Sequence, residues 1–281
     1  MIAVTGATGN IGSHVVRELV RRKVKVRALS RDPSKLRTDG HEAMKADLLD
    51  AASLDAAFAG AEKVFLMAGA RDLPRAAANA AGAAKRAGVR HVVMVSSGTI
   101  LMRPEPTIGR WHREAEEAID ASGLAWTFLR PDNFASNSLR WAGMIRAQSA
   151  VFAPAGGASA PIDPRDIGDV AVAALTSPGH EGKKYVLTGP ARMTAAEQVE
   201  AIAAALEKAV RFVAVPVEGA RAGMLKSGMD EEMASAILEL VTAGGARNGS
   251  EERLTSAVRD VAGHEARAYS EWVRDNVHAF R

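Results

Sequence analysis

The sequence predicts an α/β fold in which helices cover both faces of a doubly wound parallel sheet. Three observations support this prediction. Short apolar runs alternate with helical patterns over the first two-thirds of the 281 residues. The connections between them span about 2–6 residues, as in βαβ units. The apolar runs also lack a polar residue at every second position, which indicates strands that are covered on both faces.

Six strands and four helices are expected in this first region. The strands are predicted at residues 2–5, 24–29, 43–46, 63–67, 91–96 and 125–129. The helices are predicted at residues 13–22, 51–58, 73–87 and 110–121. In the first helix, four apolar residues fall on one face, namely Val15, Val16, Leu19 and Val20. Gly88 and Gly123 follow the last two helices, where glycine commonly ends a helix.

The rhythm changes after Pro131. Further elements are predicted as helices at residues 133–148, 166–176 and 194–208, a strand at 184–188, a strand-like run at 211–217 and a loop at 153–164. Thr194 with Glu197 three residues later is the pattern of a capping box. From residue 219 the pattern is mostly helical. We expect residues 1–152 to form the Rossmann core, and residues 153–281 to add the remaining core elements (166–190) and a smaller, mostly helical C-terminal lobe that is not an independent domain.

Composition excludes several classes of protein. The chain has no cysteine, so disulfides, thiolate catalysis and cysteine-bound zinc are ruled out. The formal net charge is +3 and the basic residues are scattered, so we expect no nucleic-acid partner. No apolar run approaches the roughly 20 residues of a membrane span, so no membrane partner is expected. The chain opens directly into strand sequence, and we expect a cytoplasmic protein without a signal peptide. Its oligomeric state is left open, with a homodimer as one candidate.

Glycines at positions 6, 9 and 12 follow the first strand. Gly6 allows the tight turn, Gly9 allows a phosphate to approach the backbone, and Gly12 allows the helix to pack close to the sheet. The helix start then offers N–H groups and a positive dipole end to an anion. This spacing between a strand and a helix predicts a Rossmann-type dinucleotide site, and the alternative is a glycine-rich turn without a ligand. The expected cofactor contacts in this loop are Gly6, Thr8, Gly9, Asn10, Ile11 and Gly12.

The end of the second strand bears on the choice of dinucleotide. An NAD site usually has an acidic residue there, but this strand ends in Ser30 and Arg31. Arg31 can bind a 2′-phosphate through charge-assisted hydrogen bonds, which predicts NADP(H) as the cofactor. The alternative is that Arg31 is solvated or pairs with Asp32. Asp47 and Leu48, which follow the third strand, are expected on the adenine side.

These motifs resemble the NmrA-like family of atypical short-chain dehydrogenases. The resemblance rests on the opening Val4–Gly12, on Leu29–Arg31, on the Val-Ser-Ser-Gly run at 95–98 and on the Thr-Phe-Leu-Arg-Pro run at 127–131, and it extends over nearly the whole chain. It implies that the cofactor lies across the carboxyl edge of the strands and that the C-terminal lobe holds the substrate. Relatives include NAD(P)H quinone reductases, isoflavone-type reductases and redox-sensing regulators.

One feature of typical short-chain dehydrogenases, a catalytic tyrosine and lysine, is missing from this sequence. Typical short-chain dehydrogenases use a tyrosine as proton donor, with a lysine four residues later. The only tyrosines here are Tyr185 and Tyr269, and neither has a lysine at that spacing. Reactions that need a positioned acid or base are therefore disfavoured. Reduction of a quinone makes smaller demands, because solvent can protonate the product oxyanion.

Other residues at the carboxyl edge are candidates for the chemistry. Ser96, Ala68 and Gly69 are expected beside the nicotinamide, and Pro131 and Phe134 beside the nicotinamide or substrate. Ser97 is a candidate to bind the substrate, the alternative being a serine that satisfies loop backbone. His112 lies near the position of the catalytic lysine of isoflavone-type reductases and is a candidate proton relay. The alternative is a partly exposed helix histidine.

We therefore predict an NADP(H)-dependent oxidoreductase that reduces a quinone or another small conjugated carbonyl compound by hydride transfer. The substrate is expected to be a small, aromatic or quinone-like molecule. No metal site is expected, because the seven histidines are dispersed and His112 with Glu116 has the spacing of an ordinary helix-surface pair. The alternative is a redox sensor that binds NADP(H) without catalysis and acts through a protein partner.

Overall fold

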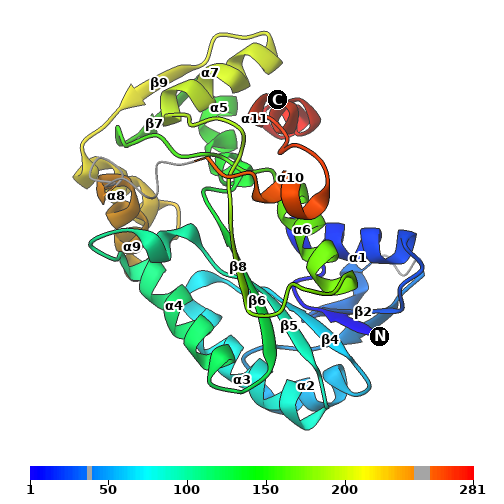
Figure 1. Ribbon diagram of the computed structural model, residues 1–281. Helices are drawn as coiled ribbons and strands as arrows, with labels where there is room; N and C mark the ends of the chain where they lie inside the picture. The colour runs from blue at the N-terminus through cyan, green and yellow to red at the C-terminus, as the bar shows by residue number, and fades with distance from the viewer. Residues whose placement is uncertain (37–39, 244–253) are drawn as a thin grey trace.

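The computed structural model describes residues 1–36, 40–243 and 254–281, and its centre is a seven-stranded sheet in the order β3-β2-β1-β4-β5-β6-β8 (Figure 1). Every neighbouring pair is parallel. The strands are β1 Ile2–Val4, β2 Val26–Ser30, β3 Glu42–Lys45, β4 Lys63–Leu66, β5 His91–Val95, β6 Ala125–Pro131 and β8 Lys183–Leu187. The strand order reverses between β1 and β4, which is where a doubly wound sheet binds its ligand. The predicted fold class is confirmed.

Helices cover both faces of this sheet, as the continuous apolar strands predict. One face packs against α1 (Asn10–Arg21), α6 (Pro164–Thr176) and α10 (Ala257–Ala262). The other packs against α2 (Ala51–Phe58), α3 (Leu73–Arg86) and α4 (Thr107–Asp120). Successive residues of β5 alternate between the two cores, Val93 and Val95 on one side and Val92 and Met94 on the other. Both sets are buried, so no polar alternation is left in the sequence.

A second group of elements lies beyond the carboxyl edge of the sheet (Figure 1). Strands β7 (Ala150–Ala153) and β9 (Arg211–Ala214) pair in parallel there. Its helices are α5 (Ala142–Gln148), α7 (Ala195–Leu206), α8 (Val217–Lys226), α9 (Glu231–Ala243) and α11 (Tyr269–Asp275). The 3-10 helices within the described residues are η1 Pro33–Lys35, η2 Ala70–Asp72, η3 Gly98–Leu101, η4 Ala135–Trp141 and η5 Val277–Phe280. No helix in the described ranges is long and apolar enough to cross a bilayer.

Predictions of single elements were less accurate in this part. Residues 133–148, predicted as one helix, divide into η4 and α5. Strand β7 is absent from the prediction because its four residues pair only with β9, some sixty residues later in the chain. The strand-like run at 211–217 ends at Ala214, and α8 starts at Val217. The capping box at Thr194 and Glu197 is present at the start of α7. Residues 244–253, within the stretch predicted as helical, lie outside the described residues.

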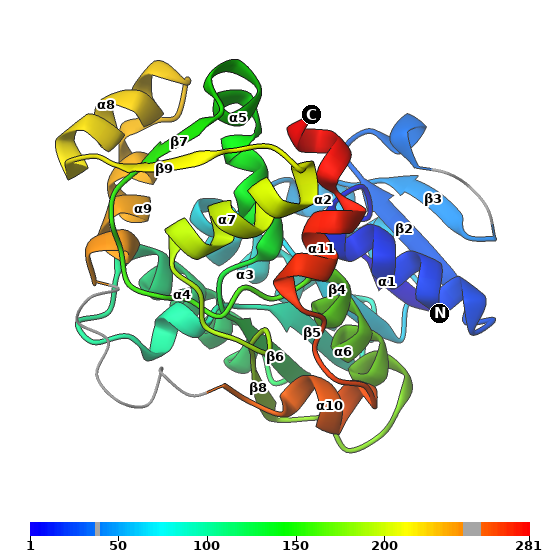
Figure 2. The ribbon, with the colours of Figure 1, turned by 90° about the horizontal axis from the view of Figure 1, so that it is seen from above.

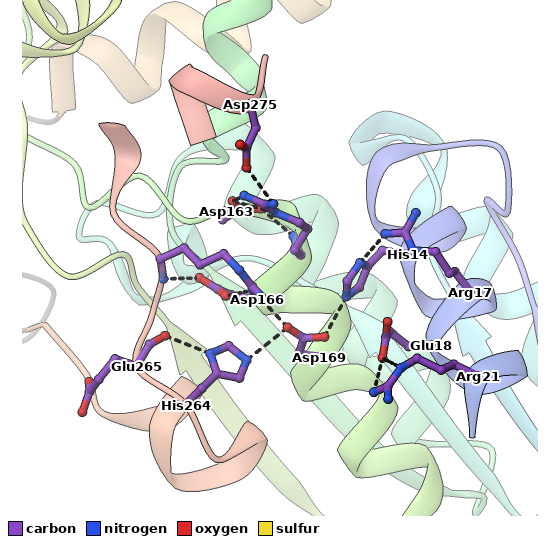
Figure 3. A network of polar contacts seen from close by, with 12 residues as sticks. His14, Arg17, Glu18, Arg21, Asp163, Asp166, Asp169, His264, Glu265 and Asp275 are labelled. Atoms are coloured by element: carbon purple, nitrogen blue, oxygen red, sulfur yellow. Dashed lines mark hydrogen bonds and ion pairs between the residues drawn. The ribbon is translucent and has the colours of Figure 1, made fainter. Parts of the chain in front are cut away.

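A partly buried polar network joins α1 to α6 and to the C-terminal segment (Figure 3). The carboxylate of Asp169 on α6 accepts from His14 Nε2 at 2.7 Å, from His264 Nε2 at 3.0 Å and from Arg267 Nη1 at 3.0 Å. Arg267 also bonds the carboxylate of Asp166, which is fully buried. Oxygen and nitrogen atoms of Asp166, Asp169 and His264 lie within 4.8 Å of one another, but the guanidinium of Arg267 already supplies the positive charge between the two carboxylates.

The start of α1 packs against the turn that follows β1. A Cβ added at Gly12 would lie 2.2 Å from the carbonyl oxygen of Gly6, which is closer than any real Cβ contact. Because both groups belong to the backbone, a side chain at position 12 would force the helix away from the turn. The predicted role of Gly12 in close packing thus has a direct geometric basis.

We expect Gly12→Ala to destabilise the protein by about 1–3 kcal/mol, the usual cost of overpacking. Gly143→Ala is the matched control, because Gly143 lies on α5 and a Cβ there would meet nothing within 4 Å. That control should be neutral or stabilising by up to about 1 kcal/mol. Urea unfolding measures both free energies. Equal stability of the two variants would contradict the close approach of Gly12 to Gly6.

Candidate functional site

The parallel order of the sheet places the carboxyl ends of all seven strands at one edge, and the predicted site residues follow these ends. The glycine loop after β1 holds Gly6 at φ +62°, a conformation that favours glycine. Gly9 is the N-cap of α1, no side chain caps this end, and the first turn carries no acidic residue. Thr8, Gly9 and Asn10 are exposed. This open helix start fits an anionic group such as a pyrophosphate.

Ile11 takes a different part in this loop. Its side chain is 1% exposed and packs in the core between the sheet and α1. Ile11 therefore anchors the loop to the core, while Thr8 and Asn10 present side chains at the surface.

Thr5 joins the ends of β1 and β4 by two hydrogen bonds, a role that was not predicted from the sequence. Its hydroxyl donates to the carbonyl of Met67 at 3.3 Å and accepts from the N–H of Met67 at 2.9 Å. These two bonds hold the chain leading to Ala68 and Gly69 beside Gly6, whose Cβ position lies 3.6 Å from the Met67 carbonyl. The predicted contacts after β1 and after β4 are thus side by side.

Arg31, directly after β2, has an exposed side chain. The carboxylate of Asp32 accepts from Ser34 N at 3.2 Å and from Ser34 Oγ at 2.6 Å, and it pairs with Lys35 at 3.5 Å. The hydrogen bond from Ser34 lowers the pKa of Asp32. Ser30 Oγ bonds the backbone of Asp32. Arg31 is exposed and has no side-chain partner among the described residues, so the alternative of an Arg31–Asp32 pair is not observed.

The loop after β3 is held by its own side chains and by α3. Asp47 Oδ1 accepts from Leu49 N at 2.9 Å, and the carbonyl of Leu48 accepts from Asn79 Nδ2 at 2.9 Å. The Leu48 side chain packs against the core between the sheet and α3. This places Asp47 and Leu48 at the same edge as the glycine loop, two strands away.

The hydroxyl of Ser96 points into the protein. Ser96 is 1% exposed, and its Oγ donates to Glu116 Oε1 at 2.6 Å. Glu116 also accepts two hydrogen bonds from Arg130, at 2.9 and 2.6 Å. This buried group ties β5, β6 and α4 together. Glu116 was predicted to lie on the helix surface, and that prediction is wrong: it is 5% exposed, because Arg130 and Ser96 compensate its charge inside the protein.

Ser97 differs from its neighbour. Its Oγ accepts from the N–H of Thr99 at 3.2 Å and from the hydroxyl of Thr99 at 2.9 Å, which caps η3. These two contacts fix the position of the Ser97 oxygen, whose proton can be donated either to Thr99 Oγ1 or outward. Ser97 is partly exposed at the edge of the sheet. It is thus an oriented hydrogen-bond donor.

His112 lies on α4, one turn before Glu116. The first turn of α4 packs closely on the loop after Ser97. A Cβ added at Gly109 would lie only 2.8 Å from the carbonyl oxygen of Thr99. His112 is 8% exposed, which excludes the alternative of a partly exposed helix histidine. Its Nδ1 is buried without a partner in the described part of the chain. Burial lowers the pKa of His112 to about 4, so the ring is neutral at physiological pH.

Pro131 and Phe134 follow β6. The carbonyl of Pro131 lies 3.3 Å from the Cβ position of Gly98, so the chains after β5 and β6 are in contact. Phe134 pairs with Ile162 in an isolated bridge, and its half-buried side chain packs against the core beside α1 and α6. Phe134 therefore lies at the junction of the sheet with the C-terminal lobe.

Comparison with known proteins agrees with this geometry. A model of NAD(P)H-binding proteins matches residues 6–178. The chain is 39% identical to an NAD(P)H azoreductase of Xenophilus azovorans, over all of this chain and 99% of that protein. It is 32% identical to quinone oxidoreductase 2 of Escherichia coli, over 69% of this chain and 70% of that protein.

A solved structure covers the chain from end to end. It is the NADPH-dependent quinone oxidoreductase of Escherichia coli in complex with NADPH, with a TM-score of 0.85 and 25% identity over 98% of this chain and 99% of that one. The resemblance predicted from the motifs is confirmed. The open glycine loop at the strand reversal, the matched region and the full-length relatives agree, and the chain belongs to the NAD(P)H-binding family.

Proposed function

We propose that this protein is an NADPH-dependent reductase of quinones, azo dyes or other small conjugated molecules. The observation that carries the proposal is the uncapped N-terminus of α1 at the glycine loop, which fits a pyrophosphate. Ser97 and the start of α4 lie at the same edge of the sheet. The names of the relatives support the chemistry. They include an azoreductase and a quinone oxidoreductase that match this chain over most of their length.

The free guanidinium of Arg31 supports the choice of NADPH over NADH. Its neighbour Asp32 is engaged with Ser34 and Lys35, so it does not neutralise Arg31. No acidic side chain stands at Ser30 or Arg31 to bind a ribose 2′-hydroxyl. An exposed arginine at this position can bind a 2′-phosphate in a bidentate manner. Ser30 and Arg31 would hold the phosphate, and Asp47 and Leu48 would lie on the adenine side.

When bound, the nicotinamide supplies a hydride to the substrate. Ser97 can donate a hydrogen bond to the oxygen or nitrogen atom on which negative charge develops, because it is partly exposed and its oxygen is fixed by Thr99. His112 is neutral, so it would act as a hydrogen-bonding group rather than as a charged acid. Ser96 and Glu116 hold β5 and α4 in place. Solvent can then protonate the reduced product.

The direct test is to mix the purified protein with NADPH and a panel of quinones and azo dyes in a stopped-flow instrument, and to follow NADPH absorbance. We expect oxidation that depends on the acceptor and saturates with its concentration. Tight binding of NADPH without oxidation across the panel would contradict a reductase and would support a redox sensor.

Replacement of Arg31 by alanine tests the cofactor choice. We expect NADPH binding to weaken by about 1–3 kcal/mol, the usual loss for a charged hydrogen-bonding partner, while NADH binding stays nearly unchanged. Isothermal titration measures both. Arg22→Ala is the control, since Arg22 is also exposed near a helix end but lies at the far end of α1. Equal losses for the two cofactors would contradict a 2′-phosphate site at Arg31.

Replacement of Ser97 tests whether the side chain acts as a hydrogen-bond donor or only through its size and shape. Ser97→Ala should lower kcat by about 100- to 1000-fold, since one preorganised donor to a developing charge is lost, with little change in NADPH affinity. Ser97→Thr keeps the hydroxyl and should retain most of the activity. Single-turnover kinetics with a quinone measures the effect. Similar losses in both variants would show that the shape of the side chain matters there, not its proton.

A further inference from the structure

Helix α4 is capped by a residue from a distant part of the chain. Its N-cap is Pro106, whose side chain forms no capping hydrogen bond, and its first turn has no acidic residue. Glu239 on α9 supplies the cap instead. Its Oε2 accepts from the N–H of Thr107 at 2.8 Å, and its Oε1 accepts from the Thr107 hydroxyl at 3.2 Å. A carboxylate at this position also interacts favourably with the helix dipole. Glu239 thus joins α9 to the helix that carries His112.

A second carboxylate attaches the other end of α9. Asp230 Oδ1 accepts from Met233 N at 3.0 Å and so caps the start of α9. Asp230 Oδ2 pairs with Arg71 Nη1 at 3.2 Å. Arg71 belongs to η2, which begins directly after Gly69 at the end of β4. The contacts of α9 therefore reach from the end of β4 to the start of α4, and both views show α9 next to α4 (Figures 1 and 2).

In the hairpin formed by α8 and α9, the apolar contacts come mainly from α9, where Ala234, Ala236 and Leu238 are buried. On α8 only Ala220 is buried, and Leu225 is 38% exposed. The C-terminal part of α9 packs closely on the loop after β7, where a Cβ at Gly156 would lie 3.1 Å from Val241 Cγ1. Exposed ion pairs of the kind seen at Arg71 and Asp230 hold a segment only weakly. The two oxygen contacts of Glu239 add to this apolar packing a polar attachment at the start of α4.

We infer that Glu239 is a positioning residue for the substrate: it holds the α8–α9 hairpin over the segments that flank the proposed hydride-transfer position, without contact to the cofactor loop. The inference rests on the proposed reductase function. The pyrophosphate and 2′-phosphate positions follow β1 and β2, whereas both attachments of α9 follow β4 and β5. The nicotinamide contacts proposed at Ala68, Gly69 and Ser96 also follow β4 and β5, so loss of Glu239 should affect the substrate end of the site and leave binding of the cofactor phosphates unchanged.

The experiment compares Glu239→Ala, Glu239→Gln and the control Glu232→Ala. Glu232 is exposed on the same helix and forms no hydrogen bond or ion pair with another described residue, so it matches the change in charge. Three quantities are measured: KM for 2-methyl-1,4-naphthoquinone at saturating NADPH, Kd for NADP⁺ by titration, and hydrogen exchange of the first turn of α4.

For Glu239→Ala we expect KM to rise by about three- to tenfold, in keeping with the loss of one cap, with Kd within twofold of the wild type. Exchange at the first turn of α4 should be faster. Glu239→Gln keeps one acceptor oxygen and should show a smaller change in the same direction. Glu232→Ala should behave as the wild type in all three measurements.

The outcomes separate the two proposals. Turnover by the wild type with an unchanged KM in Glu239→Ala overturns the positioning role alone. A parallel rise of KM and of Kd for NADP⁺ also overturns it, because that would be a general loosening of the fold. Absence of quinone and dye turnover in the wild type overturns the reductase function and this inference together.

Discussion

The contact between the start of α1 and the turn after β1 is the constraint on which the rest of the structure depends. With only hydrogen atoms between Gly12 and the Gly6 carbonyl, the helix starts directly above the turn and its N-terminus stays open. The position of α1 then determines its other neighbours. His14 packs under Gly168 of α6, where a Cβ would lie 2.6 Å from the imidazole, and bonds Asp169. Asp169 in turn holds Arg267.

These side-chain contacts continue from α6 into the C-terminal lobe. Arg267 directly precedes α11, and Tyr269 and Trp272 of α11 pack in one core with Val199 and Ile202 of α7. The network in Figure 3 therefore links α1 to the lobe. Removal of one partner from such a buried charged group is costly, because the remaining charge has no compensation. The lobe is thus built onto the sheet by polar contacts that tolerate little change.

The side of the site formed by β5, β6 and α4 is organised by a buried ion pair instead. The buried pair of Glu116 and Arg130 takes up the Ser96 hydroxyl, so the serine that faces outward is Ser97. One turn before Glu116 on α4, His112 is a neutral imidazole, and Glu116 itself is engaged by Arg130. Without a positioned acid, the site suits acceptors whose reduced form is protonated by solvent.

Much of this protein could be predicted from its sequence, because the determining interactions are local. The apolar strands, the glycine spacing and the capping box each depend on residues within one turn or one loop, and they predicted the parallel sheet, the dinucleotide loop and the start of α7. The residues at the strand ends could also be predicted, since parallel strands place their carboxyl ends at one edge. The capping of α4 by Glu239, the burial of Glu116 and the pairing of β7 with β9 were decided by the tertiary structure alone. Each joins residues that are far apart in the chain, and a hydrogen bond or ion pair between such residues leaves no periodic pattern in the sequence.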